Sequence, residues 1–249
     1  KSDFDDFGLF CAQNGFKSLP SDPKVLSLYL TYLSTKDVKM STLKRRLVSI
    51  GVIHKLKGHY LDTKHPSIIE NIMGIKRRKG SIQKGKKPLL INNLKILINV
   101  IDKEKNEEIK KIRDRSIILI GFSGGFRRKE IVSLDYDDLE FMQEGLKISL
   151  KRSKTDQFGE GSVKGLPYFE NSQYCPVISI KKWIEISKIS SGAIFRRFNK
   201  GSKLSHNRLT DQSVALLIKH YLKLAGIESK NYSGHSLRSG FATSAAESG

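Results

Sequence analysis

The chain has 249 residues, 38% of them hydrophobic, so it can form two domains that each bury a core, and a disordered basic tail is excluded. Its 45 Lys and Arg residues outnumber its 25 Asp and Glu residues, and the formal net charge of +20 indicates a polyanionic partner. The longest apolar run, residues 116–122, is too short to cross a bilayer, and residues 1–10 lack the pattern of a secretory signal.

Neither a basic amphipathic helix nor a lipid anchor points to a membrane surface, so no membrane partner is expected. We therefore expect a cytoplasmic, intracellular protein. Residue 1 is not Met, which leads us to expect a piece of a longer chain.

Metal and cofactor motifs are missing from the sequence. Cys11 and Cys175 are far apart and match no ligand spacing, and neither HExxH nor GxxxxGK[ST] occurs. His54, His59 and His65 are spaced too loosely for a metal site to be favoured over ordinary structural roles. No cofactor and no metal are expected.

A stretch rich in Lys, Arg, Gly and Ser, residues 76–88, reads as a linker because it offers little that a core could bury. We predict a helical domain over residues 1–80, a basic linker over 81–88, and a second domain over 89–249, with both domains facing the polyanion.

The first domain is predicted to be a small helical bundle. Asp22 caps a helix with Pro23 at its first position, and Ser41 caps a second helix. The apolar faces predicted for the three helices are Val25, Leu28, Tyr29, Tyr32 and Leu33; Leu43, Leu47 and Ile50; and Ile69, Ile72 and Met73.

The second domain is predicted to mix helices with a β-hairpin. Helical periodicity covers residues 93–101, 114–122 and 126–134, and returns around Trp183 and Tyr221. Leu146, Ile148 and Leu150 alternate as in a strand, and a polar turn separates them from a short apolar run, LPYF. The expected fold is mainly α with a small antiparallel β-sheet, an α+β second domain following a helical first one.

Three segments of the second domain carry cations in unusual settings: GGFRRKEIVSL, KRSKTDQFGEG and GHSLRSGFATSAAESG. Taken singly, each has an ordinary explanation as a solvated basic residue. Their order along the chain resembles the tyrosine recombinase, or phage integrase, family of the Cre-like, two-domain type. The resemblance implies Arg127 and its supporting acid Glu130, then Lys154, then His235 and Arg238 in the His-x-x-Arg box. Lys151 and Lys164 compete with Lys154 for the lysine position.

The resemblance implies strand cleavage and rejoining through a 3′-phosphotyrosine. Arg127 and Arg238 would clamp the non-bridging phosphate oxygens as charge builds on them. Lys154 would give a proton to the departing 5′ oxygen, His235 would orient or exchange protons, and Glu130 would position a cation. The family's nucleophilic tyrosine follows the His-x-x-Arg box and is missing before Gly249, so this stretch alone is expected to be inactive. Tyr232 precedes the box and Tyr221 reads as a core residue.

The N-terminal segment resembles the family's core-binding domain, and the partner implied is duplex DNA with inverted-repeat half-sites, bound by a tetramer. A non-catalytic DNA-binding protein of the same fold remains an alternative, as does a type IB topoisomerase. The residues predicted to contact DNA are Lys44, Arg45, Arg46, Arg77, Arg78, Lys79, Lys86, Lys87, Arg196, Arg197 and Lys200.

Overall fold

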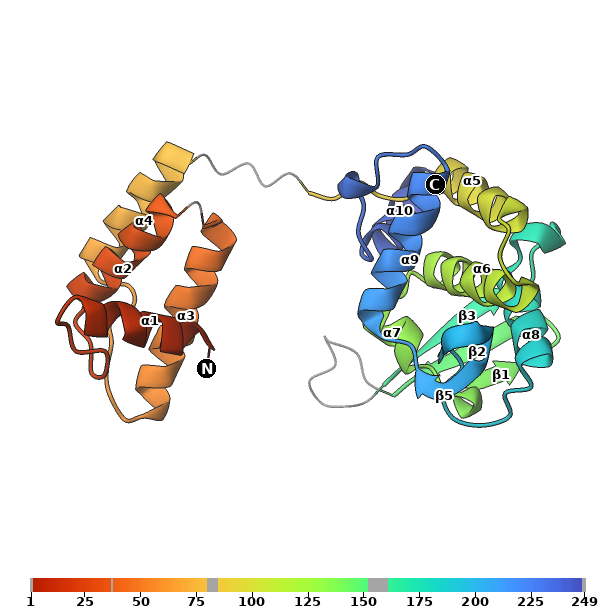
Figure 1. Cartoon of the computed structure of the whole chain (residues 1–249), viewed down its shortest axis with the longest axis horizontal. Coiled ribbons are helices and arrows are strands. Elements are labelled where there is room, and N and C mark those ends of the chain that lie inside the picture. The colour runs from red at the N-terminus through yellow and green to blue at the C-terminus, as the bar shows by residue number, and fades with distance from the viewer. Residues whose placement is uncertain (1, 37, 80–84, 152–160, 248–249) are drawn as a thin grey trace. The chain divides into compact units, whose positions relative to one another are not determined.

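The computed structural model describes residues 2–36, 38–79, 85–151 and 161–247. The chain divides into two compact units, Lys1–Lys84 and Gly85–Gly249 (Figure 1). In the described part, no helix is long and apolar enough to cross a membrane.

The first unit is a bundle of four helices: α1 (Ser2–Gln13), α2 (Pro23–Thr35), α3 (Met40–Leu56) and α4 (Pro66–Lys79). The Asp22 cap is confirmed, because its carboxylate accepts the Lys24 backbone N–H at 2.6 Å. The Ser41 cap is wrong: α3 begins at Met40, so Ser41 lies inside the helix, and the cap residue Lys39 makes no side-chain hydrogen bond.

Two of the predicted apolar faces were right only in part: Tyr29 and Leu33 are buried as predicted, but each face also includes exposed residues. Leu28 is 52% exposed, while α2 buries Leu26, Tyr29, Leu30 and Leu33. Likewise Ile69 and Met73 are exposed, and α4 buries Ile68 and Ile75. Both helices are apolar on more than one side, so the contact between α2 and α4 decides which residues are buried.

His54 of α3 has a structural role in this unit. Its side chain is buried, Nε2 accepts the Ser21 backbone N–H at 3.0 Å, and Nδ1 lies 2.9 Å from the Ile50 carbonyl oxygen. An Nε2 that accepts leaves the proton on Nδ1, which therefore donates to that carbonyl.

The second unit is built around α6 (Glu108–Ser123), whose residues Ile117, Ile118, Leu119 and Ile120 are all fully buried. Around it pack α5 (Ile91–Lys103), α8 (Pro176–Ser187), α9 (Asp211–Leu224) and α10 (Ser236–Glu247) (Figure 1). Trp183 of α8 is also fully buried, and its indole N–H donates to the Ile194 carbonyl at 2.9 Å.

Two small antiparallel sheets complete the unit. The first has the order β1 (Leu139–Phe141), β2 (Gly145–Leu150), β3 (Ser162–Pro167), and the second pairs β4 (Arg196–Phe198) with β5 (Leu204–Arg208). The predicted fold class is confirmed. The second hairpin strand begins at Ser162 rather than Leu166, and α7 (Arg128–Ser133) is shorter than the predicted helix over 126–134.

Candidate active site

Arg127 is placed by the turn that joins α6 to α7. Helix α6 ends at the Gly124 cap, Gly125 adopts a positive φ of 56°, and the buried Phe126 leads directly to Arg127. The Glu130 carboxylate accepts two hydrogen bonds from Arg127, one from its backbone N–H at 2.8 Å and one from its guanidinium Nη1 at 2.7 Å. Arg127 is therefore oriented by an acid that is itself buried.

Arg238 reaches the same turn from α10. Its Nη1 donates to the Gly125 carbonyl at 3.0 Å, although 113 residues separate the two in sequence. The exposed His235 stands just before α10, and its carbonyl accepts the Ser239 backbone N–H at 3.0 Å. The predicted pair Arg127 and Arg238 is thus anchored on one turn, with His235 three residues from Arg238.

The turn before His235 is packed tightly. A Cβ at Gly234 would lie 1.7 Å from the Arg128 Cδ atom, so a larger residue at position 234 would displace the Arg128 side chain. The Lys87 N–H donates to the Asn231 carbonyl at 2.8 Å, and the Leu89 N–H to the Ser236 carbonyl at 2.9 Å. These bonds hold the start of the second unit against the His-x-x-Arg segment.

The three candidate lysines have different surroundings. Lys154 lies outside the described residues. Lys151 is exposed and pairs with Asp138 at 3.0 Å and Asp135 at 3.6 Å, and these carboxylates raise its pKa. Lys164, on β3, instead turns toward the Gly124 carbonyl, 2.6 Å from its Nζ. Lys164 is therefore beside the arginines.

Neither tyrosine considered from the sequence is free. Tyr221 is 1% exposed, its hydroxyl donates to Asp114 at 2.9 Å, and burial is the main cause of its raised pKa. The Tyr232 hydroxyl accepts a hydrogen bond from the Asn93 amide at 3.0 Å and is mostly buried. The interpretation of Tyr221 as a core residue is confirmed.

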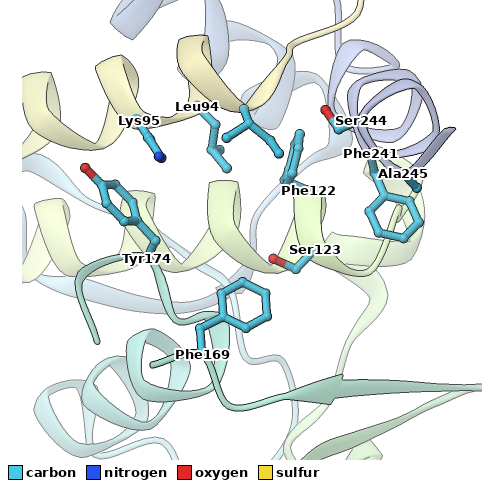
Figure 2. Close-up of a pocket in the computed structure, with 10 residues that line it drawn as sticks. Leu94, Lys95, Phe122, Ser123, Phe169, Tyr174, Phe241, Ser244 and Ala245 are labelled. Atoms are coloured by element: carbon cyan, nitrogen blue, oxygen red, sulfur yellow. The ribbon is translucent and has the colours of Figure 1, made fainter. Parts of the chain in front are cut away.

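An apolar cavity of about 370 Å³ is lined by residues of α5, α6 and α10 together with Phe169 and Tyr174. Phe122 and Phe241 line it, with their ring centroids 6.5 Å apart and nearly perpendicular (Figure 2). Phe241 follows Arg238 on α10 and also packs near Gly125, so the aromatic contact helps to fix α10 against the turn.

Replacing Gly125 with alanine tests this contact. A Cβ there would lie 2.9 Å from Phe241 Cδ1, and the positive φ costs an L-residue about 1–2 kcal/mol. Gly226→Ala is the matched control, because Gly226 has a φ of 71° and open space around its Cβ position. We expect the urea midpoint of Gly125→Ala to fall further than that of Gly226→Ala. Equal midpoints would show that the Phe241 side chain can move aside without loss of stability.

The predicted DNA-contacting residues have varied environments. In the first unit Lys44 and Arg77 are exposed, whereas Arg45 pairs with Asp3, and Arg46 with Asp6. Arg78 donates to the Ser34 hydroxyl at 2.8 Å, and Lys79 Nζ to the Val38 carbonyl at 3.1 Å.

In the second unit, Lys86 Nζ donates to the Lys230 carbonyl at 2.5 Å, close to the His-x-x-Arg segment. Arg196 bonds the Ala193 and Ser191 carbonyls at 2.8 and 2.6 Å, while Arg197 and Lys200 are exposed. The sequence did not indicate the carboxylates Asp3 and Asp6, because their partners lie about 40 residues away and no local spacing connects them.

The known proteins to which this chain is similar are integrases and recombinases. A model of the phage integrase family matches residues 89–249. The integrase/recombinase xerD homolog of Selenomonas ruminantium is 37% identical over 248 residues, which cover 98% of this chain and 72% of that protein.

Solved structures share the fold. XerH site-specific recombinase bound to its difH substrate has a TM-score of 0.62 at 16% identity, over 98% of this chain and 66% of the XerH chain. A lambda integrase tetramer bound to a Holliday junction has a TM-score of 0.54 at 13% identity, over 97% of this chain and 71% of that one. The chain therefore spans only about two thirds of the length of XerH. By the family match and the identity to the Selenomonas protein, the chain belongs to the phage integrase family, the tyrosine recombinases.

Proposed function

We propose that this chain is the DNA-binding and phosphate-activating part of a site-specific recombinase that cuts and rejoins strands through a 3′-phosphotyrosine. The observation that carries the proposal is the attachment of Arg127 and Arg238 to one turn, Arg127 by sequence and Arg238 by its bond to the Gly125 carbonyl. Two arginines attached to the same turn suit a phosphodiester whose non-bridging oxygens gain charge in the transition state.

The remaining roles follow from the chemistry. Lys154 gives a proton to the leaving 5′ oxygen, His235 orients or exchanges protons at the scissile phosphate, and Glu130 positions Arg127. The nucleophile is a tyrosine of the full-length protein other than Tyr221 and Tyr232, whose hydroxyls are both hydrogen-bonded inside the second unit.

The substrate proposed is duplex DNA with inverted-repeat half-sites, bound by four copies of the protein inside the cell. The net charge of +20 supports binding to the phosphate backbone. The exposed cations Lys44, Arg77, Lys87, Arg197 and Lys200 are the candidates for direct contact. Arg45 and Arg46 would contact phosphate only by sharing or leaving their carboxylate partners.

Covalent trapping tests the proposal. The full-length protein first selects a binding site from a random duplex library. A version of that site with a nick beside the scissile bond is then used, so that the short fragment released by cleavage dissociates and the strand cannot be rejoined. We expect a protein–DNA adduct that survives denaturation and disappears on protease digestion. Tight, salt-dependent binding without any adduct on the selected site would instead support a non-catalytic DNA-binding protein.

A further inference from the structure

We propose that Lys164 is a positioning residue for strand cleavage: it holds the Gly124–Gly125 turn so that Arg127 and Arg238 meet at the scissile phosphate. The inference rests on the proposed function and assigns Lys164 a task separate from proton donation, which stays with Lys154.

The β-hairpin directs the Lys164 side chain inward. Lys164 pairs with Ile148 in the ladder between β2 and β3, and Leu166, two residues along, is buried. Side chains two residues apart share a face of a strand, so Lys164 lies on the face that covers the core, while Val163 on the other face is 62% exposed.

The ammonium group has two partners on the turn. Its Nζ donates to the Gly124 carbonyl at 2.6 Å and lies 5.0 Å from the centroid of the Phe126 ring. A hydrogen bond to a carbonyl and a cation–π contact together fix both the direction and the depth of the lysine. Lys164 thereby contacts the residues on both sides of Gly125.

Arg238 holds the next carbonyl along the chain. Its Nη1 donates to the Gly125 oxygen at 3.0 Å, so two cations from distant elements bind successive carbonyls of one turn. Arg127 directly follows Phe126. A rotation of the Gly124 or Gly125 carbonyl would therefore move the Arg127 backbone, from which its side chain extends. Lys164 therefore connects the hairpin to both arginines.

This position is unfavourable for a charged lysine. Burial lowers the Lys164 pKa, the charges of Arg238 and Arg127 lower it further, and only the Glu130 carboxylate opposes them. A stable fold does not require a third cation beside two arginines. Ionisable groups with strongly perturbed pKa values tend to cluster at functional sites. The arrangement favours a role in the reaction over a role in stability.

The test compares two leaving groups on the selected nicked site. One substrate has the natural 5′ oxygen at the scissile bond and the other has a bridging 5′ sulfur, which leaves as a thiolate and needs no proton. Cleavage rates and DNA affinities are measured for full-length Lys164→Met, Lys164→Arg and Lys154→Met, together with their thermal midpoints.

For Lys164→Met we expect cleavage slowed by about 100-fold on both substrates, because a displacement on the order of 1 Å at a reacting centre has an effect of that size. DNA affinity should be retained, the thermal midpoint should not fall, and Lys164→Arg, which keeps a donor for Gly124, should recover part of the rate. Lys154→Met should be slow only on the oxygen substrate.

Recovery of Lys164→Met on the sulfur substrate would overturn the proposal by making Lys164 the proton donor. A wild-type rate for Lys164→Met, or a thermal midpoint so low that unfolding explains the lost rate, would overturn it as well. An absence of adduct from the wild-type protein on either substrate is a different result, since it would contradict the proposed function itself.

Discussion

Arg238→Ala in the full-length protein is expected to slow covalent adduct formation by about 100- to 1000-fold, the loss typical of one preorganised donor to a developing oxyanion. The substitution removes a donor that can bind two phosphate oxygens and also the bond to the Gly125 carbonyl. Affinity for the uncut site should change little, because most of it comes from many phosphate contacts along the duplex. The measurement is a single-turnover cleavage rate beside a binding isotherm.

Lys105→Ala is the control for the loss of one positive charge. Lys105 is exposed and precedes the first residue of α6, whereas the arginine turn follows its last residue. The 16 residues of α6 make a helix about 24 Å long, so Lys105 lies far from the arginines. Arg238→Lys should not restore the rate, since an ammonium cannot replace a planar fork of donors. A cleavage rate for Arg238→Ala equal to that of Lys105→Ala would remove Arg238 from the reaction.

The sequence predicted the second unit well where local pattern and motif coincide. The resemblance to the family implied that Glu130 supports Arg127, and the two residues share a pair of hydrogen bonds within one helical turn. Arg238 was also identified by its box, but its contact with Gly125 spans 113 residues and no sequence spacing encodes it.

Other features depend on packing that the sequence does not display. Lys151 and Lys164 were equivalent competitors in the sequence, and only the fold shows that one pairs with Asp135 and Asp138 while the other reaches Gly124. Strands β4 and β5 were not predicted, because neither has the alternation of apolar residues that marks a half-buried strand.

In the first unit, the sequence likewise does not show which acidic residue pairs with each basic one. Arg45 and Arg46 looked like free cations on a basic helix, yet α1 brings Asp3 and Asp6 against them. Net charge can be read from the sequence, but the choice of partner for each cation requires the contact between α1 and α3.

Glu130→Gln is expected to have the second large effect, slowing cleavage by about 100-fold through misplacement of Arg127. The Glu130 side chain is 5% exposed, and its two oxygens accept from the Arg127 N–H and guanidinium. Glutamine offers one acceptor oxygen, and its NH₂ group would face one of these two donors. Arg127 would therefore lose one of the bonds that orient it.

Glu140→Gln is the matched control, because Glu140 is 62% exposed and its pair with Lys147 at 2.8 Å is a surface ion pair worth about 0–1 kcal/mol. Glu130→Ala should lower the free energy of unfolding by about 1.5–3 kcal/mol, the contribution typical of hydrogen bonds to a charged group. Urea denaturation measures this change. A double mutant tests whether Glu130 acts through Arg127. If it does, adding Glu130→Gln to Arg127→Ala should slow cleavage no further than Arg127→Ala alone. If the two rate losses instead multiply, Glu130 acts on the phosphate by a separate route.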